Sequence, residues 1–189
     1  MHSIYWLMME EQSQVIFDKN VVEFVTVSAE YCAFIEQNEM ADVQEYVSTL
    51  LKILPLVYLK ALLLPDGERM GFEDPEIHVD EITYERIQLN IAKILGPDDD
   101  YLEVFVPDMA YSDQPIKQWI SEGLADIYQD LKNFVFVFQL GLNETMNDAL
   151  VICKENFEYY WGQRLVNTLR ALHNVKYSSY SEDADPDFW

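Results

Sequence analysis

The stretch YYWGQRLVNTLRALH, residues 159–173, has the spacing of a long amphipathic helix. At about 100° per residue, one side of that helix collects apolar or small side chains at Phe157, Trp161, Leu165, Thr168 and Leu172. Arg164 falls on the same side. A guanidinium buried there needs a carboxylate partner, because an unpaired buried charge is too costly to keep. The alternative is that Arg164 lays its aliphatic stem on the stripe and sends its charged end to water.

Helical spacing recurs along most of the chain. It covers residues 20–37, 41–63, 82–95, 115–140 and 143–175. With 189 residues, half of them hydrophobic, the chain suits one domain with an ample core. We therefore expect an all-α bundle of five main helices with acidic loops. Residues 1–176 form its single helical domain, and residues 177–189 form an acidic mobile tail.

Several local features refine this expectation. Apolar side chains cover most of the circumference of the first helix, so we expect it to be the central one, with Asn20 as its N-cap. Pro55 should kink the second helix. A short extended segment fits residues 101–106. The pattern FVFVF, residues 134–138, alternates like a strand inside a helical period, and both structures remain open for it.

The charge is the most unusual property of the composition. Twelve Lys and Arg face 34 Asp and Glu, which gives a net charge of −22. Such a chain repels the phosphates of nucleic acids and anionic membrane surfaces, so we expect it to bind neither directly. The same charge favours solubility and attraction to a basic protein partner.

Membrane spanning and secretion are not expected either. The most hydrophobic segment, residues 50–64, is interrupted by Lys52, Pro55 and Lys60 and is shorter than the ~20 residues that cross a bilayer. The first residues lack the basic start and long apolar run of a signal peptide. Cys32 and Cys153 lie in apolar helical patterns and fit buried free thiols. We therefore expect a cytoplasmic protein.

Three acids, Glu122, Asp126 and Asp130, form a row on one face of the fourth helix, near Trp119. Like charges at this spacing destabilise an isolated helix by about 0.2–0.5 kcal/mol per pair. The plainest interpretation is a solvated face. The sharper hypothesis is that Arg164 reaches one of these aspartates, or Glu30 of the first helix.

Known catalytic and metal patterns are not matched. No acid stands three residues before any of the three histidines, and no paired carboxylate motifs lie on facing helices. We therefore predict no metal and no cofactor. Arg170 and His173 are too close together for the helical ribonucleases, and Arg164 is too far from His173.

Three segments together resemble a bacterial family of helical proteins, domain of unknown function 5063. They are NVVEFVTVSAEYCAFIE, ISEGLADIYQDLKNF and YYWGQRLVNTLRALH, at residues 20–36, 120–134 and 159–173. The pair Trp161-Gly162 and the run LRALH, residues 169–173, recur in that family. The resemblance implies an all-α cytosolic protein of unassigned activity and supplies no reaction.

Three functional interpretations follow, of which the third, mimicry of nucleic acid to block a basic protein, rests on the charge alone. The first is a non-enzymatic, acidic protein-binding module whose loops steer it toward a basic partner. The second is a metal-dependent or small-molecule helical enzyme that uses an acidic groove. The candidate binding residues are Glu30, Trp119, Glu122, Asp126, Asp130, Trp161 and Arg164. The enzyme interpretation uses Glu122, Asp126, Asp130 and Arg164, with Glu23 and Glu30 lining the same groove. The terminal peptide DPDFW either docks on a basic groove or is an unstructured end.

Overall fold

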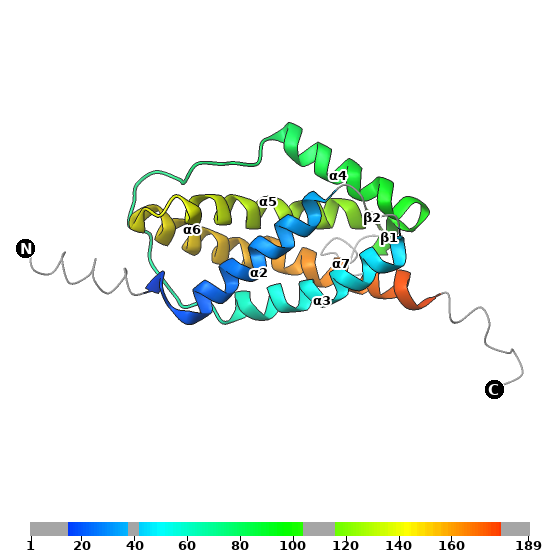
Figure 1. Ribbon diagram of the computed structural model, residues 1–189, viewed down its shortest axis with the longest axis horizontal. Coiled ribbons are helices and arrows are strands. Elements are labelled where there is room, and N and C mark those ends of the chain that lie inside the picture. Colours follow the sequence, from blue (N-terminus) through cyan, green and yellow to red (C-terminus); the bar gives the residue numbers. More distant parts are fainter. Residues whose placement is uncertain (1–14, 38–41, 104–115, 179–189) are drawn as a thin grey trace, which may run out of the picture.

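The computed structural model describes residues 15–37, 42–103 and 116–178. Its long elements are the helices α2 (Lys19–Glu36), α3 (Val43–Leu62), α4 (Glu81–Leu95), α5 (Ile120–Gln139), α6 (Asn143–Asn156) and α7 (Gly162–Tyr177). A π-helical turn, η3 (Phe157–Trp161), joins α6 to α7 without a break. Counting α6, η3 and α7 as one rod, the fold is an all-α bundle of five helices, as predicted (Figure 1).

The centre of the bundle is α5. It packs against α2, α4, α6 and α7, whereas α2 packs mainly against α3 and α5 (Figure 1). The expectation that the first helix is central is therefore wrong. That helix keeps a solvent-facing side at Val22, Thr26 and Glu30. Buried residues occur all around α5, because neighbours cover it from several directions.

Short polar side chains and glycines set the helix ends. Asp18 caps α2 by accepting a hydrogen bond from the backbone N–H of Asn20 at 2.8 Å. The prediction that Asn20 is the N-cap is therefore wrong, because Asn20 lies inside the helix. Asp42 and Asp80 cap α3 and α4 in the same way. Gly96 ends α4 with a φ of 56°, in the expected order of glycine before proline. The helix α3 continues through Pro55.

The fourth predicted helix starts later than its sequence suggests. Residues 116–119 form a strand, β2 (Ile116–Trp119), which pairs antiparallel with β1 (Asp100–Glu103) and places Asp100 opposite Trp119. The helix α5 then begins at Ile120. The strand β1 confirms part of the extended segment predicted at residues 101–106, whose last residues lie outside the described ranges. The FVFVF pattern is helical.

The segment of residues 65–80, which we call the strap, connects α3 to α4. In Figure 1 it passes the left-hand ends of α5 and α6 on its way to the start of α4. The helix α7 ends at Tyr177, one residue beyond the predicted domain limit. Residues 179–189 of the predicted tail, including DPDFW, lie outside the described residues. Within the described part of the chain, no helix has both the length and the apolar character that crossing a membrane requires.

Candidate functional site

The central site residue is Asp126, whose carboxylate accepts hydrogen bonds from two tyrosines and forms an ion pair with Arg164. The Tyr84 hydroxyl donates to Oδ1 at 2.8 Å, the Tyr160 hydroxyl donates to Oδ2 at 2.7 Å, and Arg164 Nε lies 3.1 Å from Oδ2. Only 6% of Asp126 is exposed. The solvated-face interpretation is therefore wrong for this residue. It fails because α4 and α7 both pack beside α5 here and bring these donors with them.

Arg164 is the cation of this ion pair, and two further side chains contact it. Its guanidinium lies over the Tyr160 ring, 5.7 Å from the centroid, and its Nη1 donates to Gln118 at 3.4 Å. Burial lowers the pKa of Arg164, but the Asp126 charge raises it, and the net direction is upward. Its side chain is 26% exposed, so the pair is partly shielded from water. The predicted carboxylate partner thus exists, and it is Asp126 and not Glu30.

The other predicted site residues do not join this cluster as ligands. Trp161 is fully buried, and its indole N–H donates to the Cys153 carbonyl at 3.0 Å, so it serves the core. Glu30 is exposed on α2. Trp119 and Glu122 line a shallow hollow of about 440 Å³ between α4 and the start of α5.

The π turn positions Tyr160 and Arg164 against α5. π turns insert an extra residue into a helix, and they occur frequently at functional sites. The turn brings the Phe157 carbonyl and ring close to Gly162, where an added Cβ would lie 2.4 Å from that carbonyl oxygen. Only glycine fits this position. This gives a physical reason for the Trp161-Gly162 pair.

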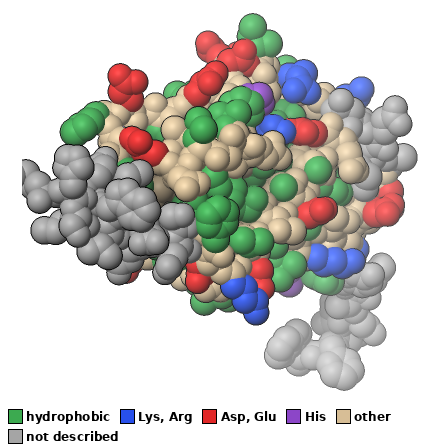
Figure 2. Space-filling model, turned by 60° about the vertical axis from the view of Figure 1, so that its left-hand side comes forward, with side chains coloured by type: hydrophobic (Ala, Val, Ile, Leu, Met, Phe, Trp, Pro, Cys, Tyr) green, Lys and Arg blue, Asp and Glu red, His purple; other side chains and the backbone are tan. Residues whose placement is uncertain are grey.

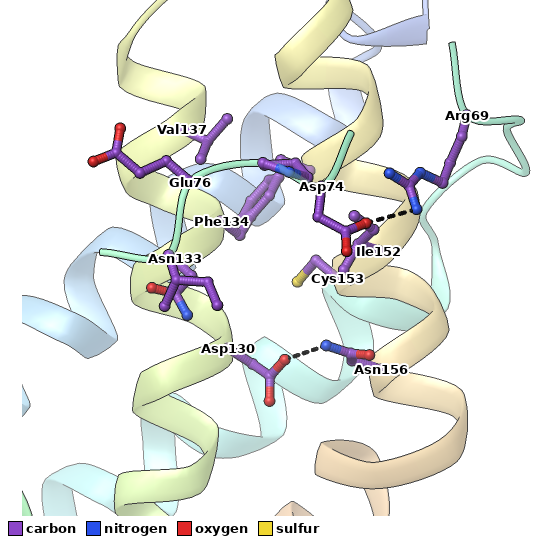
Figure 3. A pocket seen from close by; sticks show the side chains of 13 residues that line it. Arg69, Asp74, Glu76, Asp130, Asn133, Phe134, Val137, Ile152, Cys153 and Asn156 are labelled. Atoms are coloured by element: carbon purple, nitrogen blue, oxygen red, sulfur yellow. Dashed lines mark hydrogen bonds and ion pairs between the residues drawn. The ribbon is translucent and has the colours of Figure 1, made fainter. Parts of the chain in front are cut away.

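One helical turn beyond Asp126, the carboxyl of Asp130 faces a pocket of about 400 Å³ (Figure 3). The pocket lies between α5 and α6, and the strap forms one of its walls. Asp130 Oδ1 accepts from the Asn156 amide at 2.6 Å. No lysine or arginine of the described residues forms an ion pair with Asp130, so this acid, unlike Asp126, has no counter-charge.

The surroundings of Asp130 disfavour its ionised form. Burial raises its pKa, the nearby Asp126 charge raises it further, and the hydrogen bond from Asn156 lowers it, with a net value of about 6. Perturbed titratable groups in clefts are candidates for functional sites. The two aspartates of the predicted row therefore have different roles, since Asp126 is saturated by its neighbours and Asp130 is open to a ligand.

The strap is fastened at both ends by buried or partly buried side chains. Asp148 accepts from the backbone N–H groups of Met70 and Gly71, both at 2.7 Å. Asn133 accepts from the backbone N–H groups of His78 and Val79 at 2.9 and 2.8 Å. Between these anchors, the backbone of the strap is held across the pocket.

The described residues contain no group of three or more His, Cys, Asp or Glu side chains that could hold a metal ion. The metal-dependent alternative thus gains no support from them. Cys32 and Cys153 are buried free thiols, as predicted. Burial raises the pKa of Cys32 to about 12, and it also raises that of Cys153.

The comparisons with known proteins agree with this architecture. The family model described as Domain of unknown function (DUF5063) matches residues 15–178. The chain belongs to this family. It is also similar to a crystal structure of protein BF1032 from Bacteroides fragilis, a structural genomics target, with 58% sequence identity and a TM-score of 0.77. That match covers 87% of this chain and 96% of the other. A search of curated proteins found no match.

Membership of DUF5063 fixes the fold and leaves the activity open, so the site must be interpreted from its geometry. Sequence reasoning missed Tyr84, Tyr160 and Asn156 as members of the site. No site role was predicted for Tyr84, although its hydroxyl needs an acceptor when the side chain is partly buried. That requirement is the signal that could have linked it to the acid row.

Proposed function

We propose that this chain is a non-enzymatic protein-binding module that docks a basic, partly apolar segment of a partner protein on the strap. The supporting observation is the pairing of exposed apolar side chains with acids on an anchored segment. Phe72 is fully exposed and Ile77 is 74% exposed. Both lie between the anchors made by Asp148 and Asn133, so the backbone that carries them is held in place.

The charge of the strap region selects the class of partner. Residues 65–81 contain seven acids and only one Lys or Arg. Two of the acids form ion pairs within the chain, Asp66 with Lys154 and Asp74 with Arg69. Along the upper edge of the face in Figure 2, acidic side chains lie beside hydrophobic ones. Lysines and arginines next to apolar residues would complement this surface.

The net charge of −22 adds long-range attraction to the local contacts. Such steering raises the association rate for a basic partner and weakens as salt screens it. We place this binding in the cytoplasm, where a reducing environment keeps two buried cysteines as thiols.

The test uses a synthetic peptide of alternating lysine and leucine, with a glutamate and leucine peptide as the negative probe. Binding is measured by fluorescence anisotropy at low and moderate salt. The variant Glu68→Gln/Glu73→Gln, combined with Phe72→Ala, should weaken binding of the basic peptide at least about tenfold, or about 1.4 kcal/mol.

The matched control is Glu30→Gln/Glu45→Gln, which removes the same charge from exposed positions on α2 and α3. It should change binding little beyond the general loss of charge. Equal weakening by both sets of variants would mean that the peptide responds to net charge alone, and the strap would lose its assigned role.

A further inference from the structure

We propose that the pocket between α5 and α6 is a second, separate binding site, for a small organic cation with an ammonium or amidinium group on an apolar body. The site lies on the inner side of the strap, whereas the docking surface is its exposed side. Ile77 contributes to both, and the docking variants change only residues that do not line the pocket. The pocket proposal therefore does not depend on the docking proposal, and the two are tested with different variants.

The pocket has the size and lining of a small-molecule site. Its volume of about 400 Å³ falls in the range of about 300–1,000 Å³ that ligand pockets have. Most of the surface comes from side chains without charge. The apolar contributors from α5 and α6 are Phe134, Val137, Ala149, Ile152 and Cys153. An apolar body of a ligand gains free energy by covering these groups.

Asp130 and Asn156 lie together at the lower end of the pocket in Figure 3, whereas Arg69 and Asp74 pair with each other at its upper right. Asp130 Oδ1 is bonded to Asn156, and the hydrogen bonds of the described residues leave Oδ2 without a donor. The cationic side chain of Arg69 also lines the pocket but is engaged elsewhere, 2.9 Å from Asp74 and 3.0 Å from the Glu73 carbonyl. The carboxyl thus lacks the charge partner that its shielded position requires.

The charge of the lining selects a cation over an anion. Asp74 and Glu76 add two further acids to the strap side of the pocket. A carboxylate or phosphate ligand would meet Asp130 at short range and be repelled. An ammonium group can donate to Asp130 Oδ2 while its apolar body lies against Phe134 and Val137. A metal ion is a poor fit, since the described residues offer no cluster of three ligands here.

The raised pKa of Asp130 supports the same conclusion and adds a pH dependence. With a pKa of about 6, the carboxyl is mostly ionised at pH 7.5 and mostly protonated at pH 5. A cationic ligand binds the ionised form. Affinity should therefore fall as the pH drops through about 6, and bound ligand should lower the pKa of Asp130.

The experiment compares four probes of similar shape: 2-phenylethylamine, benzamidine, neutral 2-phenylethanol and anionic phenylacetate. Each is titrated into the full chain and followed by the NMR signals of the Asn133 and Asn156 side-chain amides, which line the pocket. We expect both cations to shift these signals. The neutral and anionic probes should bind at least about tenfold more weakly.

The decisive variant is Asp130→Asn, which keeps the shape and removes the charge. It should weaken both cations at least about tenfold and leave 2-phenylethanol unchanged. The matched control is Glu122→Gln, the same kind of change on the same helix outside this pocket. Circular dichroism checks that both variants fold.

The proposal is overturned if no probe shifts the pocket amides, if the alcohol binds as well as the amine, or if Asp130→Asn binds the cations normally. Failure of the strap variants to affect the lysine–leucine peptide would remove the docking proposal and leave this one intact. Loss of cation binding in the strap variants, with Asp130 unchanged, would also contradict the assignment to the pocket.

Discussion

Arg164 of α7 lies over the ring of Tyr160 with its Nε 3.1 Å from Oδ2 of Asp126 on α5, and the Tyr84 hydroxyl donates to the other carboxylate oxygen. This contact joins three helices, α4, α5 and the rod that contains η3 and α7. It explains why a guanidinium is tolerated on an apolar stripe. It also means that Asp126 is fully used within the fold and is not available to a ligand.

Removing the acid of this pair should destabilise the fold. The variant Asp126→Ala leaves two tyrosine hydroxyls and a partly shielded guanidinium without their acceptor, which should cost about 2–3 kcal/mol of unfolding free energy. Arg164→Leu should cost less, about 1–2 kcal/mol, because both hydroxyls still satisfy Asp126. Urea unfolding of the two single variants and the double variant measures their coupling.

The control for this series is Glu30→Ala, an exposed acid of α2, which should change stability by less than about 0.5 kcal/mol. If Asp126→Ala behaves like Glu30→Ala, the contact contributes nothing to the fold.

The pH dependence of stability should reveal Asp130. Its pKa rises from the ordinary 3.8 to about 6 on folding, so the folded state binds its proton more tightly than the unfolded state. Wild-type stability should therefore fall, relative to Asp130→Asn, as the pH rises from about 4 through about 6. Two pKa units correspond to about 3 kcal/mol at most. Unfolding both proteins in urea at several pH values gives this difference, and parallel curves would contradict it.

Gly162 should resist even the smallest substitution. Alanine normally stabilises a helix interior by about 1 kcal/mol relative to glycine. Here its Cβ would overlap the Phe157 carbonyl and ring, so Gly162→Ala should instead destabilise by about 1–3 kcal/mol. Val166→Ala, at an exposed position of the same helix, is the control. Thermal melts compare them, and a raised melting temperature in Gly162→Ala would show that the close approach is absent.

Loosening one strap anchor should expose the strap locally. A Cβ at Gly71 would lie 2.7 Å from Asp148 Oδ2, so Gly71→Ala should break the hydrogen bonds to Asp148 while the bundle stays folded. Limited proteolysis should then cut within residues 65–80 faster than in wild type, with little change in global unfolding. The exposed substitution Glu73→Ala serves as the control. Equal cleavage rates would mean that Asp148 does not hold the strap.

The helices could be predicted because their apolar periods are long and their ends carry ordinary caps and breakers. The start of α5 could not, since Ile116–Trp119 also fits a helical period and becomes a strand only by pairing with β1. The central helix was misjudged because apolar coverage of a single helix does not show how many neighbours it has. That number depends on the packing of the whole bundle.

The candidate site was predictable in part. The acid row and the need of Arg164 for a carboxylate are visible in the sequence, and Asp126 confirms the pairing. The burial of Asp126 was not predicted, because a helical wheel shows one apolar face of α5 and does not show that α4 and α7 both pack against the helix. The pocket at Asp130 could not be predicted from the sequence. The strap that forms one of its walls has no periodicity, and its position is set by contacts to Asn133 and Asp148.

The ligand site in the pocket depends most on Asp130 being a shielded carboxyl with no ion-pairing Lys or Arg among the described residues. Carbon-13 NMR of the aspartate carboxyl groups across a pH titration, with Asp130→Asn to assign the signal, measures this directly. We predict a midpoint for Asp130 of about 6. A midpoint near the ordinary aspartate pKa of 3.8 would mean that the carboxyl is solvated or already paired, and the pocket would lose its ligand site.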